Sequence, residues 1–133
     1  MESDRMNDIA TKPNDLEQLF VLRANAGDMD GLVSLYERDA VLNSEDGEFI
    51  AGRDEIRNFL ANYVAERRVL SRSKQFAALS NGELALTASR HNSGDVSVEI
   101  ARRQPDGSWL WVVDRFSIGR LSPNRPQLPH WLP

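Results

Sequence analysis

The spacing of apolar residues changes once along this chain, and that change constrains the fold more than any other feature. Up to residue 66 apolar side chains recur at the three- and four-residue spacing of helices, whereas from residue 75 they alternate as in strands. The strand-like runs are separated by residues 81–82, 92–94 and 105–107, and each separator contains glycine. Because short glycine-containing links are typical of hairpins, we expect helices followed by an antiparallel sheet.

Two helices are predicted at the start. The first follows Asn14, a residue type that caps helices, and Glu17 stands three residues later as in a capping box. The second follows Asp28, and its apolar stripe extends to Tyr36. A third, more regular helix follows Gly52. Residues 41–42 and 49–50 flank an acidic turn before it and predict a short hairpin.

Four longer strands are expected after the helices, at residues 75–79, 83–91, 96–103 and 109–117. Residues 84–86 and 112–113 make some strands apolar on both faces. One face would then cover the helices and the other would meet a further surface, for which a second subunit is the natural choice.

Composition excludes several classes of protein. The 133 residues suit one domain, and a net charge of −4 with no basic stripe argues against nucleic acid as a partner. The absence of cysteine excludes disulfides and thiolate chemistry and suits a cytoplasmic location. No apolar stretch approaches the roughly 20 residues that span a bilayer, so no membrane association is expected.

Three regions of the chain are distinguished by composition. Residues 1–13 are polar and acidic, and we expect a flexible N-terminus there. Residues 14–120 carry the helical and strand-like patterns and form the expected single domain. Residues 121–133 are rich in proline, which removes backbone donors, so this segment is expected to be a tail.

The order helix, helix, short hairpin, helix and long meander resembles the nuclear-transport-factor-2-like superfamily, in particular its SnoaL-like and ketosteroid-isomerase-like branches. The segments that carry the resemblance are residues 25–36, 39–42, 52–59, 107–109 and 112–117. The resemblance implies an α+β, cystatin-like fold, in which a cone-shaped, curved antiparallel sheet is wrapped by three N-terminal helices. It also implies an apolar pocket inside the cone and pairing of subunits sheet to sheet.

The same resemblance bears on catalysis. In ketosteroid isomerase an Asp moves the proton, while a Tyr and a protonated Asp hold the oxyanion. The position of that base falls on Ser44 and that of the tyrosine on Phe20, and neither side chain can take the role. The third carboxyl aligns with Glu99, although a core face formed by alternate residues from Val96 to Ile100 would instead turn Glu99 outward.

Asp114 is the candidate catalytic residue. The alignment puts Leu110, Val112, Asp114 and Phe116 on the concave face, where apolar neighbours would disfavour the ionised carboxylate. An Asp in that position is either a proton shuttle or the ion-pair partner of Arg90. The predicted ligand-binding residues are Phe20, Phe59, Tyr63, Leu86, Arg90, Glu99, Val112 and Phe116. Trp109, Trp111 and Val113 would then face outward and form a dimer interface.

Two functions remain open. The first is a homodimeric protein that binds a small, mainly apolar molecule with one polar handle. The second is an enzyme, either of the polyketide-cyclase or isomerase type, in which a pocket carboxylate moves a proton, or a hydrolase without a metal. Two histidines without spaced carboxylate partners predict no metal site, and we expect no cofactor. A carboxyl with a displaced pKa and no neutralising Arg would favour the enzyme.

Overall fold

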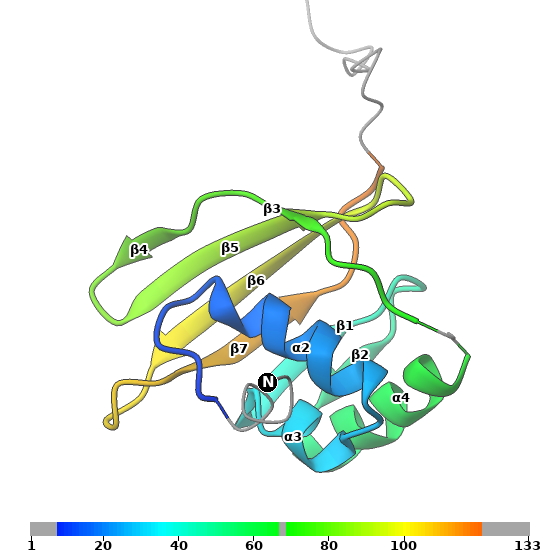
Figure 1. The fold of residues 1–133 in the computed structure, drawn as a ribbon, viewed down its shortest axis with the longest axis horizontal. Coiled ribbons are helices and arrows are strands. Elements are labelled where there is room, and N and C mark those ends of the chain that lie inside the picture. Colours follow the sequence, from blue (N-terminus) through cyan, green and yellow to red (C-terminus); the bar gives the residue numbers. More distant parts are fainter. Residues whose placement is uncertain (1–7, 67–68, 121–133) are drawn as a thin grey trace, which may run out of the picture.

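A seven-stranded curved sheet carries the helices on one side (Figure 1). The computed structural model describes residues 8–66 and 69–120. The strands are β1 (Tyr36–Asn43), β2 (Phe49–Ala51), β3 (Lys74–Gln75), β4 (Leu79–Asn81), β5 (Leu84–Arg90), β6 (Val96–Arg103) and β7 (Trp109–Arg115). The helices are α2 (Asp15–Asn25), α3 (Met29–Val33) and α4 (Arg53–Ala65). In Figure 1, α2 lies against the sheet at β7, while α3 and α4 gather near β1 and β2.

The strand order is β2-β1-β7-β6-β5-β3, with β4 paired to β5 beside β3. All hairpin-connected pairs are antiparallel, as the turn sequences predict. β1 and β7 run parallel, and this long-range pair joins the early hairpin to the meander. It places Leu42 opposite Asp114, so the first strand after the helices borders the candidate catalytic residue.

The helix starts differ in part from the prediction. Asn14 makes no side-chain capping hydrogen bond to α2, and Asp15 Oδ2 instead accepts from the Thr11 and Lys12 amides. The second helix is only five residues long, because the chain enters β1 at Tyr36, inside the apolar stripe that predicted a longer helix. Tyr36 is therefore a fully buried strand residue, and the prediction that it belongs to a helical stripe is wrong.

A β-bulge in β7 decides which side chains face the helices. Ile100 pairs with Val113 and Ala101 pairs with Trp111, so Val112 is the extra residue between them. Trp109 and Trp111 consequently lie in the core, 8% and 4% exposed, together with Asp114. The predicted outward row of Trp109, Trp111 and Val113 is wrong for both tryptophans, because strict alternation does not hold across a bulge.

The convex face of the sheet carries a row of apolar residues. Directly paired positions share a face, and the register joins Leu79 to Leu86, Leu86 to Ile100, Ile100 to Val113 and Val113 to Val41. Three of these side chains are strongly exposed, namely Leu79 at 71%, Leu86 at 46% and Ile100 at 37%. We call these five residues the convex row.

The packed part of the chain includes residues before Asn14. Ala10 is buried, and its carbonyl accepts a hydrogen bond from the Trp109 amide at 2.9 Å. The packed domain therefore includes Ala10, which precedes the predicted boundary at Asn14. The predicted proline-rich tail, residues 121–133, lies outside the described residues. Within residues 8–66 and 69–120, each helix is too short or too polar to cross a lipid bilayer.

Candidate functional site

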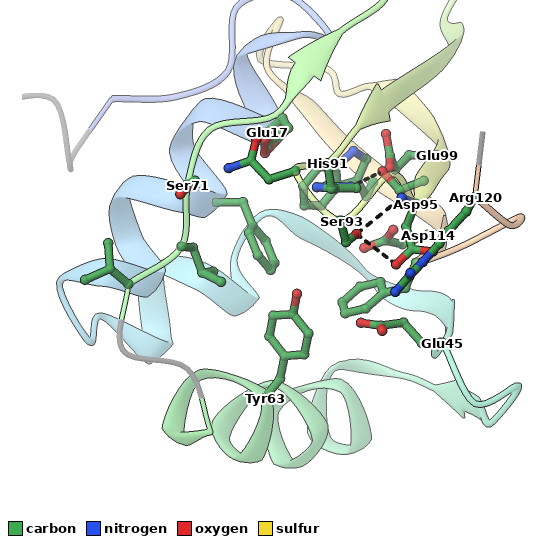
Figure 2. Close-up of a pocket in the computed structure, with 17 residues that line it drawn as sticks. Glu17, Glu45, Tyr63, Ser71, His91, Ser93, Asp95, Glu99, Asp114 and Arg120 are labelled. Carbon is green, nitrogen blue, oxygen red and sulfur yellow. Dashed lines mark hydrogen bonds and ion pairs between the residues drawn. The ribbon is translucent and has the colours of Figure 1, made fainter. Parts of the chain in front are cut away.

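A cavity of about 450 Å³ lies between the concave face of the sheet, helices α2 and α4, and residues 69–71. Its floor is formed by β6 and β7, and its rim by residues 91–95 and Arg120. Figure 2 shows Tyr63 pointing from α4 toward the cavity, with Glu99 and Asp114 on the sheet side. This volume is within the range of small-molecule sites. We call it the inner cavity.

Two buried carboxyl groups face the inner cavity from adjacent strands. Glu99 of β6 pairs directly with Asp114 of β7, and the two residues are 6% and 4% exposed. Such opposite residues have Cβ atoms about 5 Å apart. No described basic side chain makes an ion pair with either one. We call Glu99 and Asp114 the carboxyl pair.

Burial sets the proton affinity of the carboxyl pair. It raises the pKa of Glu99 to about 7, although hydrogen bonds from Thr87 and Ser97 act in the opposite direction. Burial, and next the charge of Glu99, raise the pKa of Asp114 well above its ordinary range. Because the two groups interact, their protons belong to the pair. The carboxyl pair therefore keeps protons at a higher pH than ordinary carboxyl groups do.

Tyr36 holds Asp114 in place. The Tyr36 hydroxyl donates a hydrogen bond of 2.6 Å to Asp114 Oδ2, and both groups are buried. This bond lowers the pKa of Asp114, but by less than burial and Glu99 raise it. Since Oδ2 accepts from Tyr36, the other carboxyl oxygen is left to carry the proton.

A line of polar groups leads from the carboxyl pair to the rim. Thr87 Oγ1 donates to Glu99 Oε1 at 2.7 Å, and Ser97 also hydrogen-bonds to the Glu99 carboxyl. Ser97 Oγ lies 2.9 Å from His91 Nε2. His91 lines the cavity at the end of β5 and is half-buried. These contacts connect Glu99 with a titratable group near solvent.

Glu17 adds a third carboxyl, from α2. Its Oε1 accepts from the Ser73 hydroxyl at 2.6 Å and from the Ser73 amide at 3.3 Å. Burial raises the pKa of Glu17, and its charge in turn raises the pKa values of Glu99 and Asp114. Glu17 therefore lines the cavity and does not act in a capping box.

The structure brings most of the predicted site residues together. Those that line the inner cavity are Phe20, Tyr63, Glu99, Asp114 and Phe116. Phe59 lies behind them, with its ring 5.5 Å from that of Phe116 and 6.1 Å from that of Tyr63. The outward orientation of Glu99 suggested by alternation is wrong, because β6 turns Ser97, Glu99 and Ala101 inward and Ile100 outward.

Three predicted residues lie elsewhere. Leu86 belongs to the convex row, since Ala85 and Thr87 are the buried residues of β5. Val112 is displaced by the bulge and does not line the cavity. Arg90 cannot pair with Asp114 as a strand neighbour, because β6 lies between β5 and β7.

The two positions aligned with the ketosteroid isomerase machinery have structural roles here. Ser44 is buried in the turn after β1, and its Oγ accepts a hydrogen bond from the Glu48 amide at 3.0 Å. Phe20 packs against Trp111, with ring centroids 5.8 Å apart. The ionisable groups of this site instead include the carboxyl pair and Tyr36.

Sequence reasoning did not place Glu17, Tyr36, Ser97 or Trp111 in the site. Glu17 and Tyr36 carried helix signals, and Trp111 carried an alternation signal that the bulge reverses. Ser97 shares a face with Glu99 two residues later, which was the one local signal available. Among the described residues, no three His, Asp or Glu side chains are arranged to hold a metal ion.

Comparisons with known proteins bear on the fold. No known family profile matches the chain, and no curated protein matches its sequence. A cystatin-like protein of unknown function from Nostoc punctiforme superposes with a TM-score of 0.64 at 14% identity, covering 84% of this chain and 92% of that chain. An NTF2-like protein with a cystatin-like fold from Novosphingobium aromaticivorans gives 0.58 at 20% identity, covering 76% and 75%.

A SnoaL-like protein of unknown function from Burkholderia thailandensis also matches, with a TM-score of 0.58, 16% identity and coverage of 80% and 94%. This chain has the nuclear-transport-factor-2-like fold. The α+β class, the curved sheet and the N-terminal helices are thereby confirmed. NTF2-like folds carry many unrelated activities, so the function must be argued from the inner cavity.

Proposed function

We propose that the protein is an acid–base enzyme that moves a proton on a small molecule held in the inner cavity. The observation that carries the proposal is the carboxyl pair: two buried acids, directly opposite on adjacent strands, with no described basic partner. A binding protein has no need for two unneutralised buried acids, which cost stability. Proton transfer needs an acid and a base with different proton affinities, which the pair supplies.

The roles follow from the hydrogen bonds. Ionised Glu99 accepts a proton from a carbon next to a carbonyl group of the bound molecule. Protonated Asp114, oriented by Tyr36, donates its hydrogen to the carbonyl oxygen as negative charge develops there. Return of the proton from Glu99 to a second carbon completes an isomerisation, and return to the first carbon gives exchange with solvent.

The test is hydrogen–deuterium exchange into 2-tetralone, a bicyclic ketone with acidic C–H bonds and a size suited to the cavity. In D₂O at neutral pH, NMR should show exchange about 100-fold faster with the wild type than with Glu99→Gln, the range that general-base catalysis provides. Binding is followed in parallel from tryptophan fluorescence, since Trp111 lines the cavity.

The matched control is Glu48→Gln, which removes an exposed carboxyl outside the inner cavity. It should exchange 2-tetralone at the wild-type rate. Binding of the ketone with no exchange above the Glu99→Gln background would contradict the enzyme and favour the binding protein.

We also propose that two copies pair through the convex row. The row is continuous across β4, β5, β6, β7 and β1, and it leaves leucine and isoleucine side chains in water. An exposed apolar patch that crosses a sheet is typical of an interface. The convex row replaces the tryptophan interface that the sequence suggested, and it lies on the same outer face of the sheet.

Placing a charge in the convex row should separate the copies. Ile100→Glu puts a carboxylate in the middle of the row, where burial without a partner is costly. Sedimentation should report a dimer for the wild type and a monomer for Ile100→Glu at micromolar concentration. Asn58→Glu, on the exposed side of α4, is the control and should stay dimeric. A monomeric wild type would contradict the pairing.

A further inference from the structure

The charge of the inner cavity is strongly one-sided. Its deep wall carries three carboxyl groups from three elements, Glu17, Glu99 and Asp114. Arg120 is at the rim, where it is 72% exposed and lies 3.6 Å from Asp95. The charges of His91 and Arg72 lower the pKa of Glu17, but by less than burial raises it. An anionic ligand that filled the cavity would therefore meet the carboxyl pair, with which no described basic side chain makes an ion pair.

The rest of the wall is aromatic. Phe20, Tyr63, Trp111 and Phe116 line the cavity, and they pack as two ring pairs. Phe20 and Trp111 have centroids 5.8 Å apart, and those of Tyr63 and Phe116 are 5.1 Å apart. Packed rings keep their orientation, and their faces attract cations as well as flat apolar groups.

One polar group of the wall has no partner in the described chain. Trp111 is 4% exposed, and its indole N–H makes no hydrogen bond with any described residue. A buried donor without an acceptor is rare in a finished core. Its place beside the cavity is consistent with a ligand that carries a hydrogen-bond acceptor, such as the carbonyl group of the proposed function.

From the three carboxyl groups, the aromatic walls and the indole, we propose that the inner cavity binds a small organic cation, a protonated amine on a flat apolar body that also carries the carbonyl group. The ammonium group lies at Glu17, which leaves the carboxyl pair to the carbonyl group, and the apolar body lies between the ring pairs. This inference rests on the proposed function, because it names the class of substrate for the same cavity.

Binding of a cation is expected to change the protonation of the cavity's carboxyl groups. In the empty cavity, burial raises the pKa of Glu17. An ammonium group favours ionised Glu17, so the complex forms with release of a proton, and the affinity rises with pH below the raised pKa of Glu17. The titratable and charged groups that face the cavity, the pair or Glu17 are Glu17, Tyr36, Glu45, Tyr63, Arg72, His91, Asp95, Glu99, Asp114 and Arg120.

The experiment compares three probes with one ring system: 2-naphthylmethylamine, 2-naphthalenemethanol and 2-naphthoate. Calorimetric titration at pH 7 should show the amine binding at least tenfold more tightly than the alcohol, and the carboxylate more weakly than both. Amine affinity should rise between pH 5.5 and pH 7.5, with proton release seen as a dependence of the heat on the buffer. The alcohol should show neither effect.

Variants locate the effect. Glu17→Gln should remove most of the preference for amine over alcohol, whereas the control Glu48→Gln should keep it. His91→Gln should keep the direction of the pH dependence, which assigns the released proton to a carboxyl group.

Equal affinities for amine and alcohol, tightest binding of the carboxylate, or no binding of any probe would each overturn the inference. Exchange of 2-tetralone in a protein that shows no amine preference would leave the proposed enzyme standing and refute only the cation.

Discussion

Replacing Glu99 by Gln is expected to stabilise the fold at pH 8 and to leave it nearly unchanged at pH 4. The pKa of Glu99 is raised from 4.5 to about 7 in the folded protein. Between these values the folded state binds more protons than the unfolded state, so the free energy of unfolding falls as pH rises. The shift corresponds to about 3 kcal/mol in the free energy of unfolding, which the wild type loses by pH 8 and the glutamine variant keeps.

Glutamine keeps the hydrogen bond that Thr87 donates, because its amide oxygen replaces Glu99 Oε1. Urea unfolding at pH 4, 6 and 8 measures the difference between variant and wild type at each pH. Glu48→Gln, which changes an exposed carboxyl, should follow the wild type throughout. A Glu99→Gln variant less stable than the wild type at pH 8 would mean that Glu99 is solvated, and the carboxyl pair would lose its basis.

Replacing Trp111 by Ala is expected to destabilise the fold by about 3–5 kcal/mol, the range for an aromatic core residue cut back to Ala. The indole ring packs against the rings of Tyr36 and Phe20, with centroid distances of 5.1 Å and 5.8 Å. Its loss therefore opens a void next to the carboxyl pair. The loss should be the same at all protein concentrations, because the contacts are within one subunit. Thermal unfolding at two concentrations measures it.

Leu86→Ala is the control that tests whether Trp111 lies in the core or on the outer face of the sheet. Leu86 is 46% exposed in the convex row, so its truncation should cost about 1 kcal/mol or less in the monomer. Its larger effect should be on dimerisation and should therefore vary with concentration. A loss below 1 kcal/mol for Trp111→Ala, or one that depends on concentration, would place the indole on the outer face and refute the bulge at Val112.

The main elements of the fold were predictable because their signals are local. The turn sequences fixed the antiparallel hairpins, since glycine at positive φ reverses the chain, as at Gly82 and Gly107. The apolar spacing in residues 53–65 predicted α4. The resemblance to the family, aligned through Trp109 and residues 112–113, placed Asp114 on the concave face, and Asp114 lines the inner cavity.

Asp114 was predicted on the correct face of the sheet, but the strict alternation assumed in that prediction holds only at one end of β7. The same alternation put Leu110 and Val112 inside and both tryptophans outside, which the bulge reverses. Strict alternation assumes a continuous ladder, and a bulge appears only when a strand is paired with its neighbours.

The sequence by itself determined that helices precede a hairpin-linked sheet, because periodicity and turn chemistry act over a few residues. Only the tertiary structure decided the chemistry of the site. The parallel pairing of β1 with β7 brings Tyr36 to Asp114 from 78 residues away, and the register of β6 with β7 sets Glu99 opposite Asp114. Long-range pairing and burial, which change proton affinity, are properties of the assembled sheet and are not encoded in any local segment.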